Sequence, residues 1–248
     1  MIELLMPPEL ALSIVGLLLG VSFFASFITA AFGLGGGAVL LALMAILLPP
    51  AALIPVHGVV QLGSNLGRAG TMLRHVVWAS LPAFTVGSLI GVALGGVLAV
   101  NFPPWMVQVG IGCFIIWSVL ARPPRWMATN AGLTGTISSF LTMFFGATGV
   151  FVAVFTKSLG LSRHGLVSTH AALMTVQHGL KSVMFAVLGF AFAPWAGLII
   201  GMILFGLLGT LAGRQVLNRL TDHRFMLALN GILLVTAARL IWAGLTGE

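Results

Sequence analysis

The sequence predicts an all-α polytopic membrane protein built from two inverted-topology repeats, and three observations support this prediction. Of the 248 residues, 59% are hydrophobic and 6% are charged, whereas about 25% are charged in soluble domains. Apolar runs cover nearly the whole chain, and several reach the roughly 20 residues that a membrane-spanning helix needs. A polar motif occurs twice in register inside this apolar sequence. We therefore expect a single integral membrane unit.

The duplicated motif is a stripe of polar side chains. A shift of 113 positions superimposes its two copies, with these matched pairs: His57 and His170, Asn65 and His178, and Arg68 and Lys181. Gln61 belongs to the first copy and Gln177 to the second. At about 100° per residue, the spacings within each copy fall on roughly a quarter of a helix circumference. Because ionisable groups inside membrane segments usually face a cavity or pathway, each stripe is predicted to line one.

Each stripe follows a short helix that begins at a glycine-rich break. The breaks are Gly33-Leu-Gly-Gly-Gly37 and Gly146-Ala-Thr-Gly149, and the apolar runs after them, 37–48 and 149–158, are too short to span a bilayer. Paired short segments of this kind in two halves point to a transporter binding site. Near Gly36, Gly37 and Gly149, the helix starts are expected to offer exposed N–H groups and positive helix ends.

The charged residues indicate the sign of the cargo. The chain has only four carboxylates, and none lies between residues 10 and 221. No buried carboxylate is therefore available to bind Na⁺ or a divalent metal, whereas an anion would meet Arg68 and Lys181. The net charge of +7 comes from scattered bases at loop ends and does not indicate nucleic acid. The predicted partners are a small anionic substrate and the lipid bilayer.

The distribution of Lys and Arg predicts the orientation of the segments. The basic residues that mark cytoplasmic connections are Arg74, Arg122, Arg125, Lys157, Arg163, Arg214, Arg219 and Arg224. The connections near 99–104 and 189–194 carry no charge and are assigned to the opposite side. The corresponding spans 76–99 and 194–214 then cross in opposite directions, as inverted repeats do. The N-terminal repeat is predicted at 1–125 and the C-terminal repeat at 126–248.

The Gly33–Gly37 break, the Pro49-Pro50 turn and the repeated half together resemble the sulfite exporter TauE/SafE family, also called the toluenesulfonate uptake permease family. The resemblance covers nearly the whole chain. The second half departs from the family pattern because its break, Gly146-Ala-Thr-Gly149, contains fewer glycines. The stripe of His, Asn and Arg resembles one branch of the family. It implies a multi-pass transporter of the bacterial inner membrane. The implied cargo is a small sulfur-containing oxyanion, sulfite or an organosulfonate such as sulfoacetate, moved outward.

The side chains themselves favour oxyanion binding. Arginine offers a planar fork of donors, lysine a point charge with three donors, and imidazoles and amides further donors. The candidate substrate-binding residues are His57, Gln61, Asn65, Arg68, His170, Gln177, His178, Lys181, Gly36, Gly37 and Gly149. Transport is expected to occur by alternating access around this central cationic site. Lys181 lies about seven residues from an uncharged loop, so snorkelling to the membrane interface is the alternative for this residue.

Two other classes of protein stay open at this stage. An anion channel would use the same broken helices and central charge, and flux saturation would distinguish it from a transporter. An intramembrane haem or metal protein would use His57, His170 and His178, but no carboxylate or cysteine accompanies them. No nucleophile–base–acid set is visible, so we expect neither an enzyme nor a bound cofactor or metal. The oligomeric state is open, a homodimer included.

Two sets of glycines are assigned to helix packing rather than to the site, because small residues let helices approach closely in membranes. They are Gly87, Gly91 and Gly95, and Gly201, Gly206 and Gly209.

Overall fold

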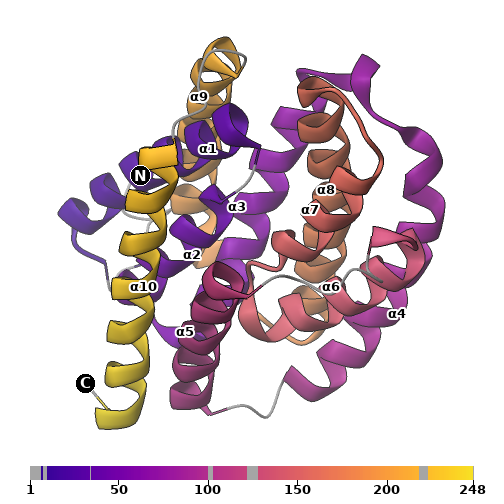
Figure 1. The fold of residues 1–248 in the computed structure, drawn as a ribbon. Coiled ribbons are helices and arrows are strands. Elements are labelled where there is room, and N and C mark those ends of the chain that lie inside the picture. Colours follow the sequence, from indigo (N-terminus) through magenta and orange to yellow (C-terminus); the bar gives the residue numbers. More distant parts are fainter. Residues whose placement is uncertain are drawn as a thin grey trace.

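The computed structural model describes residues 7, 10–33, 35–99, 103–121, 128–217 and 223–247, which form α-helices and short 3₁₀ helices without a strand (Figure 1). The α-helices are α1 (Leu12–Phe32), α2 (Gly36–Leu47), α3 (Pro50–Gly70), α4 (Leu81–Ala99), α5 (Pro104–Leu120), α6 (Ala131–Phe145), α7 (Gly149–Ser158), α8 (Arg163–Val187), α9 (Ala196–Val216) and α10 (His223–Thr246). The predicted all-α fold and the two short helices after glycine breaks are confirmed.

The lengths and compositions of the helices fit a multi-pass membrane protein. Among the residues that the structure describes, four segments are long and apolar enough to cross a bilayer: Leu12–Phe32, Trp78–Leu98, Ala193–Val216 and Leu229–Thr246. The helices α3 and α8 have 21 and 25 residues, so they are long enough to span as well. They fall outside this group because each carries a polar stripe, which lowers its mean hydropathy.

The helices pack in pairs that repeat between the two halves. The 113-residue shift matches α1 with α6, α2 with α7, α3 with α8, α4 with α9 and α5 with α10. The helix α1 packs against α9, and correspondingly α6 packs against α4. The matched helices α3 and α8 pack against each other, as do α5 and α10, which lie side by side in Figure 1. These four helix pairs are the same when each helix is replaced by its match in the other half.

The matched helices α3 and α8 run antiparallel. Near the middle of α3, Gly58 approaches the Lys181 side chain, close to the end of α8. Just beyond the end of α3, Met72 packs with Val167, near the start of α8. A matched pair that runs in opposite directions is what an inverted repeat requires.

The helices α5 and α10 are antiparallel too, since Gly112 lies against Ile241 and Gly244 lies against Trp105. The inverted superposition and the boundary at 125/126 nevertheless stay predictions. Several residues that carried the charge argument lie outside the described residues, namely Arg122, Arg125 and Arg219, together with the side chain of Arg224.

Glycines bring the paired helices together. A Cβ at Gly91 on α4 would collide with the carbonyl oxygen of Thr136 on α6, and one at Gly209 on α9 with the carbonyl oxygen of Phe23 on α1. The other predicted packing glycines, Gly87, Gly95, Gly201 and Gly206, also lie within close contact of a neighbouring helix. The packing role predicted for these glycines is confirmed, and it explains how these helices approach so closely.

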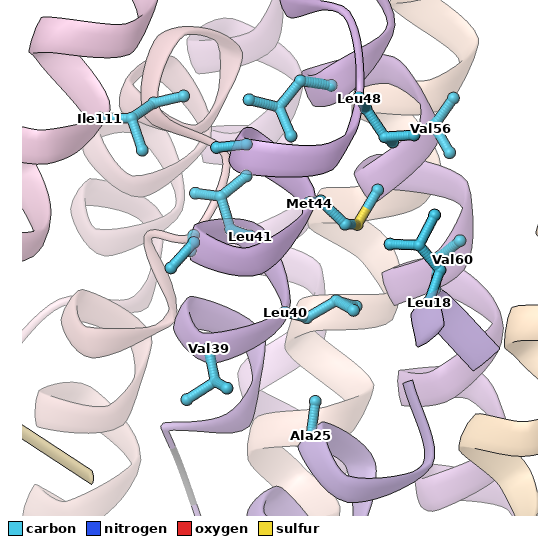
Figure 2. Packing of buried hydrophobic residues seen from close by; sticks show 14 of the residues in the cluster. Leu18, Ala25, Val39, Leu40, Leu41, Met44, Leu48, Val56, Val60 and Ile111 are labelled. Atoms are coloured by element: carbon cyan, nitrogen blue, oxygen red, sulfur yellow. The ribbon is translucent and has the colours of Figure 1, made fainter. Parts of the chain in front are cut away.

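The short helix α2 lies at the centre of the apolar core. Its side chains Leu40, Leu41 and Met44 are at most 2% exposed, and residues of α1, α3 and α5 surround them (Figure 2). A helix that is apolar on all sides must be buried in the protein or in lipid. Burial in the protein lets the chain break before α2 at membrane depth, because irregular backbone is tolerated there only away from lipid.

The inverted repeat predicts that positions 74 and 187, which differ by the 113-residue shift, lie on opposite sides of the membrane. Arg74 and Val187 are both exposed, so cysteines placed there, in a Cys113→Ala background, should be accessible. In intact cells a membrane-impermeant maleimide should label Val187→Cys, whereas Arg74→Cys should react only after lysis. Labelling of both positions from outside, or of neither, would contradict the inverted arrangement.

Candidate functional site

A small, partly open cavity lies where the starts of α2 and α7 meet the stripes of α3 and α8. Its volume is about 60 Å³. The structure places seven of the eleven predicted site residues on its wall: Gly37, Gln61, Asn65, Arg68, Gly149, His170 and His178. The other four, His57, Gln177, Lys181 and Gly36, do not line it. Side chains from both halves therefore converge on one cavity.

Two matched breaks in the chain give the cavity its shape. The helices α1 and α6 are followed by Gly33 and Gly146, whose φ angles of 92° and 72° are positive. This backbone conformation favours glycine because it has no Cβ. The N–H of each glycine donates to the carbonyl oxygen of a threonine four residues earlier, Thr29 at 2.9 Å and Thr142 at 3.1 Å. The two halves therefore turn the chain by the same local structure.

The helix starts after these breaks face the cavity. Neither α2 nor α7 has a side-chain hydrogen bond to its first turn from the residue that caps it, Gly35 and Thr148 respectively. The first N–H groups of a helix have no partner within the helix, and the helix dipole is positive at that end. Gly37 and Gly149 thus bring backbone of positive potential to the cavity from two sides.

A histidine ties each stripe to the neighbouring short helix. His57 Nε2 lies 3.2 Å from the carbonyl oxygen of Gly37, and His170 Nε2 lies 3.1 Å from that of Gly149. Because a carbonyl oxygen can only accept, Nε2 is the donor in both bonds. Each stripe helix is thereby fixed to the start of the short helix before it, and in a neutral imidazole Nδ1 is left as an acceptor.

Arg68 provides the positive charge of the cavity. Its side chain is 2% exposed. Its Nη1 donates to Asn65 Oδ1 at 2.9 Å and its Nη2 donates to Ser64 Oγ at 3.0 Å. Ser64 Oγ in turn lies 2.8 Å from Ser26 Oγ on α1. Nε has no hydrogen-bond partner, and the described residues include no carboxylate. Neutral oxygens therefore orient the guanidinium without neutralising it.

The two glutamines of the stripes have different surroundings. Gln61 lines the cavity beside Gly37. Gln177 does not line it: its Oε1 accepts a hydrogen bond from Ser138 Oγ at 2.5 Å, and its Nε2 donates to Thr148 Oγ1 at 2.9 Å. Thr148 directly precedes α7. Gln177 therefore stabilises the chain break before α7 from the side away from the cavity.

Lys181 and His57 lie beside the cavity rather than on its wall. The side chain of Lys181 is fully buried, and its Nζ donates to the carbonyl oxygen of Gly146 at 3.5 Å. Lys181 therefore does not extend to the membrane interface. The His57 ring packs edge-on against the His178 ring, with the centroids 5.8 Å apart.

Gly36 is a packing residue in this structure. A Cβ at this position would collide with the carbonyl oxygen of Ala25 on α1. At the start of α2, Gly37 rather than Gly36 therefore lines the cavity.

Sequence reasoning missed several residues that line the cavity, among them Thr29 and Met174. The correspondence between the two halves could have identified both residues. Thr29 matches Thr142 under the 113-residue shift, and Met174 matches Gln61. Thr29 was not predicted because it precedes the glycine break, and Met174 was not predicted because its side chain is apolar.

The histidines do not gather into a metal centre. In the part of the chain that the structure describes, no group of three or more His, Cys, Asp or Glu residues lies close enough to hold a metal ion. His170 and His178 lie on the cavity wall, and His57 lies behind it.

A larger apolar hollow of about 520 Å³ opens on one side of the protein. Its wall includes Ile54, near the start of α3, and Phe185, near the end of α8. At the opposite ends of these helices Met72, Val167 and Leu217 pack against one another. The hollow therefore lies toward the uncharged connections, and this apolar cluster lies toward the side with basic residues.

Comparison with known proteins identifies one family. A family model described as Sulfite exporter TauE/SafE matches residues 18–240, which is nearly the whole chain. No curated protein and no solved structure matches the chain.

The two glycines at the helix starts should differ in their tolerance of alanine. A Cβ at Gly37 would lie 2.5 Å from Gln61 Nε2, whereas a Cβ at Gly149 would make an ordinary contact of 3.5 Å with His170 Nε2. The Gln61 amide can swing aside, so Gly37→Ala should fold but lose about tenfold in sulfite affinity, or about 1.4 kcal/mol. Gly149→Ala should bind nearly as the wild type does. Isothermal titration of the solubilised protein measures both affinities, and equal losses would contradict this reading of the cavity wall.

Proposed function

The chain belongs to the sulfite exporter TauE/SafE family, and from this membership we propose that it exports sulfite or a small organosulfonate, such as sulfoacetate, across the bacterial inner membrane. The observation that carries the proposal is the cavity in which the buried Arg68 side chain meets two helix starts, with no carboxylate among the described residues. A cation would be repelled from this cavity, whereas an anion would be attracted to it.

The chemistry of a sulfur oxyanion complements the groups on the cavity wall. Sulfite and sulfonate groups present three acceptor oxygens around a negative centre. The Nε–H of Arg68 has no partner among the described residues, and the helix starts near Gly37 and Gly149 bring N–H groups and positive potential to the same cavity. Charge-assisted hydrogen bonds are about twice as strong as neutral ones, so a few such donors suffice for binding.

The size of the cavity favours a small anion. A water-sized atom needs about 10–15 Å³ of such space, so about 60 Å³ has room for roughly four to six of them. Sulfite has four heavy atoms and fits this space as it stands. An organosulfonate with a carbon chain requires the cavity to widen, and we propose sulfite as the reference substrate.

We propose alternating access as the mechanism. The cluster of Met72, Val167 and Leu217 closes one side, and the Arg163 guanidinium reinforces it by donating to the carbonyl oxygen of Leu217 at 2.8 Å. Rocking one repeat against the other would open this side and close the hollow. A monoanion that leaves a cell with a negative interior gains about 2.3 kcal/mol per 100 mV, so export needs no coupling ion.

The proposed function is tested with proteoliposomes that are loaded with sulfite and hold an inside-negative potassium diffusion potential. Efflux should be saturable, independent of Na⁺ and accelerated by sulfite outside, as a carrier requires. Efflux that rises linearly with concentration and lacks this acceleration would indicate an anion channel. Absence of sulfite and sulfonate efflux would contradict the proposed function.

Removal of the cavity charge should abolish transport. Arg68→Ala should lower sulfite affinity at least about thirtyfold, because loss of a buried charge opposite a ligand costs about 2–5 kcal/mol. Arg74→Ala removes an exposed arginine just beyond the same helix and is the matched control, expected to retain wild-type affinity. Size-exclusion profiles establish that both variants are folded. Wild-type affinity in folded Arg68→Ala would refute the assignment of the site.

A further inference from the structure

Lys181 occupies a second cationic position that is separate from the cavity at Arg68. Arg68 lines the cavity, whereas Lys181 does not. The two cations lie on different helices, α3 and α8. Lys181 is fully buried, and its acceptor is the carbonyl oxygen of Gly146, the residue that directly follows α6. The two charges of the duplicated stripe therefore have different surroundings.

This second position lies between the cavity and the apolar hollow. On one side, His178 lines the cavity and precedes Lys181 by three residues, which places both on one face of α8. On the other side, Gly146 lies next to the side chain of Ile54, and Ile54 lines the hollow. An anion that leaves the cavity toward the hollow would pass Lys181.

The polar groups at this position lack partners in the described part of the protein. The Nδ1 atoms of His57 and His178 are buried without a hydrogen bond. Lys181 has three N–H donors and a single acceptor at 3.5 Å, the long end of the range. Buried polar groups normally have partners, so these three incompletely satisfied side chains, of which the His57 and His178 rings are in contact, indicate a ligand position.

The tautomer of His57 determines which hydrogen-bonding groups this ligand must carry. His57 Nε2 donates to the carbonyl oxygen of Gly37, which leaves Nδ1 of the neutral ring as an acceptor. Lys181 offers donors only. A ligand that satisfies both must be negatively charged and also carry an N–H or O–H donor.

We propose that His57, His178 and Lys181 form a second binding station, which receives the substrate between the Arg68 cavity and the hollow. The station selects monoanions that carry a hydrogen-bond donor, as hydrogensulfite does. This inference rests on the proposed function and divides the path into two steps. The Arg68 cavity captures the oxyanion, and the Lys181 station passes it to the hollow.

Sulfamate and methanesulfonate test the selectivity on the unmodified protein. Both are monoanions of similar size near neutral pH, but only sulfamate carries N–H donors. Wild-type proteoliposomes should export sulfamate at least several times faster than methanesulfonate, and His57→Phe should remove this difference. Equal wild-type rates for the two anions would overturn the acceptor role of His57, whatever the variants show.

Lys181→Met tests the separation of the two stations. This variant should bind sulfamate with nearly wild-type affinity but export it at least tenfold more slowly, and Lys181→Arg should restore part of the rate. Lys157→Met removes an exposed lysine and should change neither quantity. Loss of binding in folded Lys181→Met, like that expected for Arg68→Ala, would mean a single site, and a wild-type export rate would mean that Lys181 is structural.

The controls separate this inference from the proposed function. Wild-type liposomes that export no sulfur oxyanion contradict the function itself. Wild-type liposomes that export sulfite, with Lys181→Met indistinguishable from them, contradict only the second station.

Discussion

The positive charge of Arg68, buried without a counter-charge, is the constraint on which the rest of the structure depends. A charged side chain at the centre of a bilayer costs about 2.5–3.5 kcal/mol on insertion scales, and the chain has no carboxylate between residues 10 and 221 to offset this cost. Asn65 and Ser64 supply neutral oxygens instead. Such partners make the guanidinium tolerable without neutralising it. Its field is left for a mobile anion, because no carboxylate of the described residues competes for it.

Two broken helices make this arrangement feasible inside a membrane. A chain break at membrane depth leaves N–H and C=O groups that lipid cannot satisfy. Here Thr29 and Thr142 accept from the glycines at the breaks through their backbone oxygens, and His57 and His170 donate to carbonyl oxygens of the short helices. The burial of α2 in the apolar core keeps lipid away from the first break. Each half therefore contributes the same local structure to one cavity.

The fold could be predicted from the sequence to the extent that it depends on local patterns. The apolar runs predicted the helices, and the glycine breaks predicted the starts of α2 and α7. The exchange of partners, with α1 against α9 and α6 against α4, could not be predicted, because periodicity defines an apolar face but not the helix that covers it. The site shows the same limit: a stripe is resolved to about a quarter of the helix circumference. Within this sector of α8, side-chain packing decides that Gln177 bonds to Ser138 whereas His178 lines the cavity.

The proposed site requires that a small oxyanion bind beside Arg68 between the starts of α2 and α7. Anomalous diffraction at the selenium edge, from crystals grown with selenite as the heavy analogue of sulfite, tests it most directly. The methionines contain sulfur, so selenite is the source of the signal. We expect a selenium peak within hydrogen-bonding reach of the Arg68 guanidinium and of the backbone at Gly37 and Gly149. A well-ordered cavity without such a peak, or a peak confined to the apolar hollow, would contradict it.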